Sequence, residues 1–127
     1  MRFFNPATIS KPASHYSQGV IIPANAERLI MAGQSGANPD GSLAEGLEAQ
    51  MERAWLNLFA ILEDAGMTKE NLVKITVFMV GDGHTAAYRE VRDRMLDGHA
   101  PAATYLVVAG LAGPEMLFEV EGEAVSS

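Results

Sequence analysis

The segment Leu72–Val80 constrains the fold more than any other stretch, because its pattern predicts a strand that is apolar on both faces. One face would carry Val73, Ile75, Val77 and Met79, and the other Leu72, Phe78 and Val80, interrupted by Lys74 and Thr76. A strand of this kind must be covered on both sides. We expect helices to cover one side and another subunit to cover the other.

A long helix is predicted before this strand. Apolar residues recur at helical spacing from Leu47 to Ala65, and Gly66 follows as a C-cap. Ser42 and Glu45 have the spacing of a capping box, so we expect the helix to begin beside Ser42. Trp55 falls on the apolar stripe and is expected in the core, with stacking against a ligand as the alternative.

A second helix is expected after the strand, from about Thr85 to Leu96, with Gly98 ending it. One stripe of this helix would carry Tyr88, Val91, Arg92 and Met95. The stripe is apolar apart from Arg92, so we expect this helix also to pack on the sheet.

The remaining apolar runs predict further strands, with Gly, Pro and Asn marking the turns. They are an edge strand at residues 1–4, a hairpin of residues 16–22 and 28–32 turning at 25–27, and two final strands within residues 101–121 joined at 110–114. The order β-β-β-α-β-α-β-β indicates an α+β fold in which both helices pack on one sheet face.

Composition narrows the function classes. Residues 1–127 are expected to form a single domain, and the net charge of −7 argues against a nucleic-acid partner. There is no cysteine, which excludes disulfides and thiolate catalysis, and the three histidines show no metal-ligand spacing, so no metal is expected. With no evident signal peptide or membrane span, we expect a cytoplasmic protein without a membrane partner.

Several polar residues near strand or helix ends could carry chemistry. They are Tyr16, the amides around Gly33, Gln34, Arg89, Tyr105 and Glu119. Glu119 lies in an apolar run, and a half-buried carboxylate is a good candidate for moving protons. The alternative is that these residues are ordinary surface groups with satisfied hydrogen bonds.

Some of these residues belong to motifs that resemble those of a known family. The chain has Pro101-Ala102-x-Thr104, then Leu111, then Phe118 through Ala124; it also has Tyr16-Ser17-Gln18-Gly19, Ala32-Gly33-Gln34 and Asn57-Leu58 through Ala65-Gly66. This set resembles the reactive-intermediate deaminase family (RidA/YjgF-like) over nearly the whole chain.

The resemblance implies a chorismate-mutase-like fold, with a mostly antiparallel six-stranded sheet and two helices on one face. It also implies a homotrimer with a central barrel-like core and clefts between subunits that bind a small molecule. Of the family's site residues, the Tyr matches Tyr16 and the catalytic Glu matches Glu119. The family's Ser is replaced by Ala32, its carboxylate-binding Arg by Ala103, and its Asn position falls on Arg89.

What the resemblance implies for function is hydrolysis of an imine or enamine to a carbonyl compound and ammonia, without a cofactor. Glu119 would activate water, while Tyr16 and the amides near Gly33 would orient the substrate. Arg89 is a hypothetical replacement for the lost Arg, against the alternative of a solvated charge paired with Glu90 or Asp93. A non-catalytic small-molecule-binding trimer using the same cleft is the second hypothesis. Ribonuclease or translation-inhibitor activity is the third, and the acidic charge argues against it.

Overall fold

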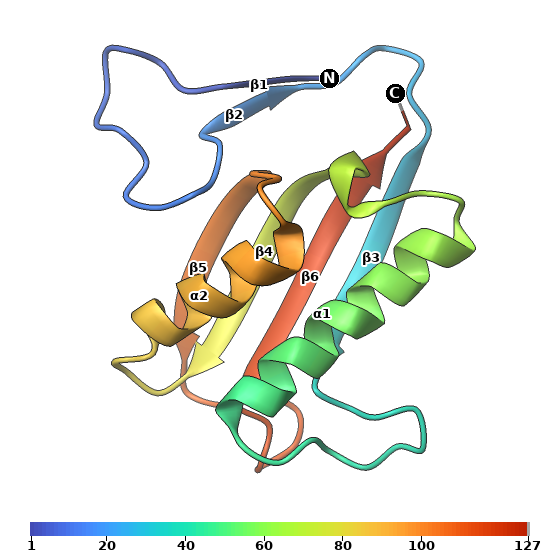
Figure 1. The fold of residues 1–127 in the computed structure, drawn as a ribbon, viewed down its shortest axis with the longest axis vertical. Coiled ribbons are helices and arrows are strands. Elements are labelled where there is room, and N and C mark those ends of the chain that lie inside the picture. Colours follow the sequence, from blue (N-terminus) through green and yellow to red (C-terminus); the bar gives the residue numbers. More distant parts are fainter. Residues whose placement is uncertain (127) are drawn as a thin grey trace.

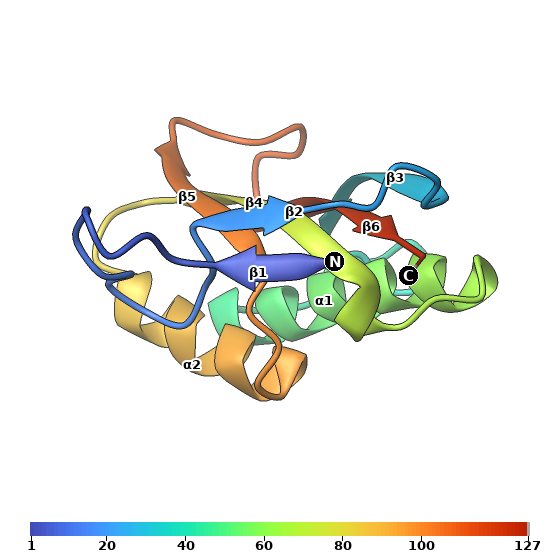
Figure 2. The ribbon, with the colours of Figure 1, turned by 90° about the horizontal axis from the view of Figure 1, so that it is seen from above.

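The computed structural model describes residues 1–126 as a four-stranded sheet with two helices on one face and a separate two-stranded sheet (Figures 1 and 2). In chain order the elements are β1 (Arg2–Phe4), β2 (Gly19–Ile21), β3 (Arg28–Ser35), α1 (Leu47–Asp64), a 3₁₀ turn η1 (Lys69–Asn71), β4 (Leu72–Val80), α2 (Thr85–Leu96), β5 (Ala102–Val108) and β6 (Phe118–Val125). The α+β class is therefore confirmed.

The main sheet is mixed, with the strand order β3-β6-β4-β5. β6 is antiparallel to both β3 and β4, whereas β4 and β5 are parallel. Parallel neighbours need a crossover connection, and α2 supplies it. The expectation of a single six-stranded sheet is wrong, because β1 and β2 pair with each other as a separate two-stranded sheet. The strand pairs are mostly antiparallel, and β4 with β5 is the parallel pair.

The predicted hairpin of residues 16–22 and 28–32 is also wrong. β2 pairs with β1 rather than with β3, although the turn at residues 25–27 lies between β2 and β3. The last two strands are not neighbours, because β6 inserts between β3 and β4 while β5 pairs with β4. Turn residues indicate where the chain bends, but burial of apolar faces decides which strands meet.

α1 begins later than the capping box predicts. Gly46 is its N-cap, with φ of 87°, and no side chain caps the helix there. The Ser42 hydroxyl instead donates to Asp40 Oδ1 at 2.6 Å, within the loop before the helix. At the other end Gly66 adopts a φ of 74°, a left-handed conformation that suits glycine and ends the helix.

The core lies between the helices and the sheet. Trp55, Met51 and Leu58 of α1 pack with Phe118 and other apolar side chains of the sheet, and all four are fully buried, which confirms Trp55 as a core residue. The opposite face of the sheet carries no helix (Figure 2). Coverage of that face by another subunit stays a prediction.

Candidate functional site

A cavity of about 210 Å³, here named the α2 cavity, lies between the N-terminal loop, α2 and the edge strand β5. It is lined by Ala13, Ser14, Tyr16, Thr85, Tyr88, Arg89, Arg92, Ala103, Thr104 and Tyr105. These residues come from three separate parts of the sequence. Four of the predicted site residues are among them, namely Tyr16, Arg89, Ala103 and Tyr105.

Helical spacing places three large side chains of α2 on the cavity wall. They are Tyr88, Arg89 and Arg92. Arg92 lies four residues after Tyr88, so these two side chains share one face of the helix. The Arg92 guanidinium carbon lies 5.6 Å from the centre of the Tyr88 ring. Among the described residues Arg89 forms no ion pair, and Asp93 pairs with Arg92 instead. The pairing of Arg89 with Glu90 or Asp93 is therefore not seen.

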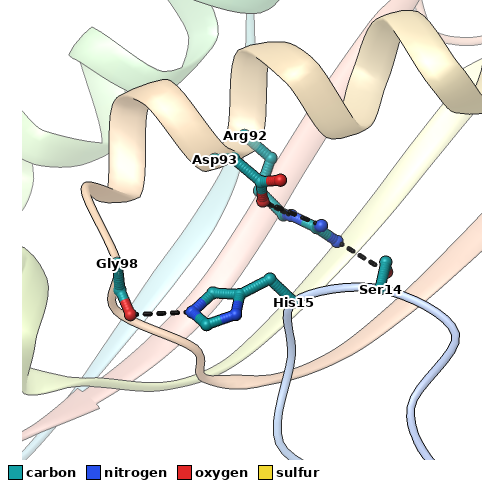
Figure 3. A network of polar contacts seen from close by, with 5 residues as sticks. All are labelled: Ser14, His15, Arg92, Asp93 and Gly98. Carbon is teal, nitrogen blue, oxygen red and sulfur yellow. Dashed lines mark hydrogen bonds and ion pairs between the residues drawn. The ribbon is translucent and has the colours of Figure 1, made fainter.

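The N-terminal loop is held against α2 and the start of β5 by polar contacts (Figure 3). Arg92 Nη1 donates to Ser14 Oγ at 3.2 Å, and His15 Nε2 lies 2.8 Å from the Gly98 carbonyl oxygen. The Ser17 hydroxyl donates to the Ala100 carbonyl at 2.5 Å. These contacts on both sides of Tyr16 bring it to the cavity.

Aromatic rings form the floor of the cavity. The rings of Tyr88 and Tyr105 have their centres 5.2 Å apart, and Tyr88 also packs on Phe118 at 5.9 Å. Burial raises the pKa of Tyr88 above its ordinary value, although the charge of Arg92 acts in the opposite direction. Tyr88 therefore stays neutral at physiological pH and can act only as a neutral phenol.

A second cluster forms where β3 meets β6. The register of this pair shifts between Met31 and Gln34, which leaves Ala32 and Gly33 in a bulge. Glu119, opposite Ser35, places its carboxylate directly over the bulge. A Cβ atom built on Gly33 would lie only 2.5 Å from Glu119 Oε2, so this close approach requires glycine.

The two clusters lie on opposite faces of the sheet. Phe118 packs on Tyr88 at the helical face, and side chains alternate along a strand, so neighbouring Glu119 points to the other face. Glu119 also pairs with Phe78, which pairs with Leu106, two strands from the edge that borders the cavity. A single chain therefore does not bring Glu119 together with Arg89.

Residues 32–34 lie with Glu119 rather than with the cavity. Gln34 turns back on its own strand, where its Nε2 donates to the Ala32 carbonyl at 3.2 Å. Ala32 is exposed and Gly33 half-buried. The predicted residues thus divide into Tyr16, Arg89, Ala103 and Tyr105 on one side and residues 32–34 with Glu119 on the other.

Six residues that line the cavity were not predicted as site residues, namely Ala13, Ser14, Thr85, Tyr88, Arg92 and Thr104. Arg92 falls on the apolar stripe of its helix, and this position could have marked it as a site residue. Arginine is rarely fully buried unless its charge has a partner. Ser14 lies in an irregular loop and carries no comparable signal.

Within residues 1–126, no group of three histidine or acidic side chains is arranged to hold a metal ion. Over the same residues, neither helix has the length and apolar composition needed to cross a bilayer.

The fold and these motifs match known proteins. Residues 8–126 match the family model described as Endoribonuclease L-PSP. The RutC family protein slr0709 of Synechocystis is 33% identical over 129 residues, which cover 98% of this chain and 96% of that protein.

Two solved structures give the same picture. The Rid family protein YyfB of Yersinia pestis superposes with a TM-score of 0.88 at 29% identity, over 97% of this chain and 96% of that one. TdcF of E. coli, solved with bound serine, superposes with a TM-score of 0.75 at 25% identity over the whole of both chains. The chain therefore belongs to the Endoribonuclease L-PSP family, the family of RidA/YjgF-like proteins.

Proposed function

We propose that this protein hydrolyses an imine or enamine to a carbonyl compound and ammonia, in a cleft between two subunits. The observation that carries the proposal is the Glu119 carboxylate, which is half-buried and packed over the glycine of the β3 bulge. A carboxylate held against backbone at a bulge is well placed to act on a small molecule.

The cleft requires a second copy of the chain, because Glu119 and the α2 cavity lie on opposite faces of the sheet in one copy. The cavity borders β5, whose outer edge carries no further strand of the main sheet, so a neighbouring copy could approach there. In this proposal each subunit supplies Glu119 to one cleft and the Tyr16–Arg89 cavity to another. A closed ring of three copies is the proposed assembly.

The chemistry needs no cofactor because an imine carbon is already electrophilic. Glu119 would take a proton from a water molecule as the oxygen bonds to the imine carbon, and the nitrogen would be protonated. The resulting carbinolamine would lose ammonia as its C–N bond breaks and the carbonyl forms. Tyr16 and the backbone around Gly33 would orient the substrate in this step.

The anchor for a substrate carboxylate is the part of the site that differs from the family pattern. Position 103 carries alanine, whose side chain offers no hydrogen bond to an anion. Arg89 also lines the cavity, and we propose that it compensates for the lost arginine. The serine bound to TdcF supports the idea that clefts in this family accept amino-acid-like molecules.

The test is ammonia release from freshly generated imines of acidic, neutral and basic amino acids and of carboxylate-free amines. Glu119→Gln, which keeps the shape and removes the base, should lower the rate by roughly 10²- to 10⁴-fold. Equal rates for the two proteins would refute the role of Glu119. Loss of activity only on carboxylate substrates in Arg89→Gln would identify Arg89 as the anchor.

A non-catalytic small-molecule-binding trimer is the second candidate. It is favoured by Ala32 and Ala103, which replace two polar residues of the family pattern with side chains that cannot hydrogen-bond. Ligand binding without ammonia release from any imine of the panel would support it. The net charge of −7 argues against RNA as the substrate, despite the description of the family model.

A further inference from the structure

The charges around the α2 cavity are unusual for this protein. The chain has 16 acidic and 9 basic residues, yet among residues 1–126 the cavity is lined by two arginines and by no carboxylate. Ser14, Tyr16, Thr85 and Tyr105, whose side chains carry hydroxyl groups, also line it. A small space with two guanidinium groups, several hydroxyls and no acid has the composition of an anion site.

Arg92 is the more informative of the two arginines, because it is only 3% exposed. A guanidinium has five N–H groups, and burial of an unpartnered one is costly. Arg92 Nε donates to Asp93 Oδ1 and Nη1 donates to Ser14 Oγ. Nη2 lies 2.9 Å from the same Asp93 oxygen but makes no hydrogen bond in the structure.

The surroundings fix this guanidinium in place. It is held over the Tyr88 ring on one side. At its tip it is tied to Ser14 (Figure 3). Asp93, its ion-pair partner, has a side chain that is 51% exposed, so water screens that pair. Arg92 therefore contributes a fixed positive charge to the wall of the cavity, while its counter-charge lies largely in solvent.

We propose that Arg92, assisted by Arg89 and the Ser14 hydroxyl, binds the carboxylate of the ligand in the α2 cavity. The planar, fork-shaped guanidinium matches a carboxylate, and the small cavity favours a compact anion. The anion anchor has thus moved from position 103 on β5 to α2. The inference uses the cleft of the proposed function, but it concerns binding alone and does not depend on hydrolysis.

The test is titration of the intact protein with pyruvate, a stable 2-keto carboxylate, followed by NMR and by calorimetry. Pyruvamide, in which a neutral amide replaces the carboxylate, and inorganic phosphate serve as comparison ligands. Arg92→Gln removes the donor and the charge. The matched control is Arg94→Gln, because Arg94 lies on the same helix but forms exposed ion pairs with Glu48 and Glu52.

We expect wild-type protein and Arg94→Gln to bind pyruvate equally, and Arg92→Gln to bind it roughly 10- to 100-fold more weakly. Pyruvamide should bind weakly to all three proteins. Equal pyruvate binding by Arg92→Gln and wild type would overturn the proposal and leave Arg89 as the anchor. Phosphate binding tighter than pyruvate binding would overturn the choice of a carboxylate.

Arg92 also ties Ser14 to α2, so its replacement could unfold the loop and weaken binding indirectly. Asp93→Asn separates the two effects, because it removes the competing carboxylate and leaves the arginine in place. We expect this variant to bind pyruvate about three- to tenfold more tightly. Unchanged affinity in Asp93→Asn would leave Arg92 as a purely structural contact and refute the inference.

Discussion

Replacing Gly33 with alanine should displace the Glu119 carboxylate without unfolding the protein. The new Cβ would lie 2.5 Å from Glu119 Oε2, whereas ordinary contact begins at 3.4 Å, so the carboxylate must retreat by about 0.9 Å. Misplacing a catalytic group by about 1 Å can cost on the order of 10²-fold in rate. We therefore expect Gly33→Ala to lose about a hundredfold in ammonia release.

The stability change should be small, because the atom that must move ends a flexible side chain. Forcing Glu119 off its rotamer costs about 0.5–1.5 kcal/mol. Alanine also lowers the conformational entropy of the unfolded chain, which stabilises the folded state by about 0.4–1 kcal/mol. We expect the free energy of unfolding of Gly33→Ala to stay within about 1 kcal/mol of wild type, measured by urea denaturation.

Two other glycines provide control variants for this experiment. A Cβ at Gly36 would lie 2.6 Å from the backbone Cα of Gln50, which cannot swing away, so Gly36→Ala should lose about 1–3 kcal/mol of stability. A Cβ at Gly110 meets no atom within 4 Å, so Gly110→Ala should change neither quantity. If Gly33→Ala keeps wild-type activity, or is destabilised as much as Gly36→Ala, the assignment of Glu119 and its glycine contact is refuted.

Three further predictions follow from buried or hydrogen-bonded groups. The Leu117 amide donates to the buried Gln50 Oε1 at 2.8 Å, so Gln50→Leu leaves that amide without an acceptor. We expect this variant to lose about 1–3 kcal/mol of stability in urea denaturation, and an unchanged midpoint would contradict this. Because burial raises the pKa of Tyr88, its phenol should ionise above the ordinary range of tyrosine when followed by absorbance near 295 nm. The free energy of unfolding should fall as pH rises above about 10, where the unfolded phenol ionises and the folded one does not. A hydrogen bond from the Thr68 hydroxyl lowers the pKa of Glu70, so this hydrogen bond stabilises the protein above about pH 4 and the stabilisation is lost in more acidic solution. Thr68→Val should raise the pKa of Glu70 in a carbon-detected NMR titration, and an unchanged pKa would refute this cause.

The elements with strong periodicity could be predicted from sequence alone. The predicted ranges 72–80 and 85–96 coincide with β4 and α2, because their apolar patterns repeat at the strand and helix periods. The start of α1 was predicted too early, since Ser42 has a nearer partner in Asp40 than the helix amides. Local spacing predicts which side chains could interact but not which competitor wins.

Strand pairing and the assembly of the site could not be predicted in the same way. The register of β6 with β3 and β4 joins residues that are far apart in sequence, and no local signal specifies it. The same pairing places Glu119 on the face opposite the α2 cavity, which separates residues that the sequence suggested as one site. Arg92 was assigned to a packing stripe, and only its burial beside Ser14 distinguishes it from a surface charge.

The late position of β6 in the chain has a consequence for how the protein folds during synthesis. β6 is the strand that joins β3 to β4, so those two strands have no common partner until residues 118–125 leave the ribosome. Until then the apolar face of α1, with Met51 and Leu58, lacks one of the two strands against which it packs. Completion of the sheet must therefore wait for these non-local contacts, and part of the apolar surface of α1 stays uncovered in the nascent chain until β6 is made.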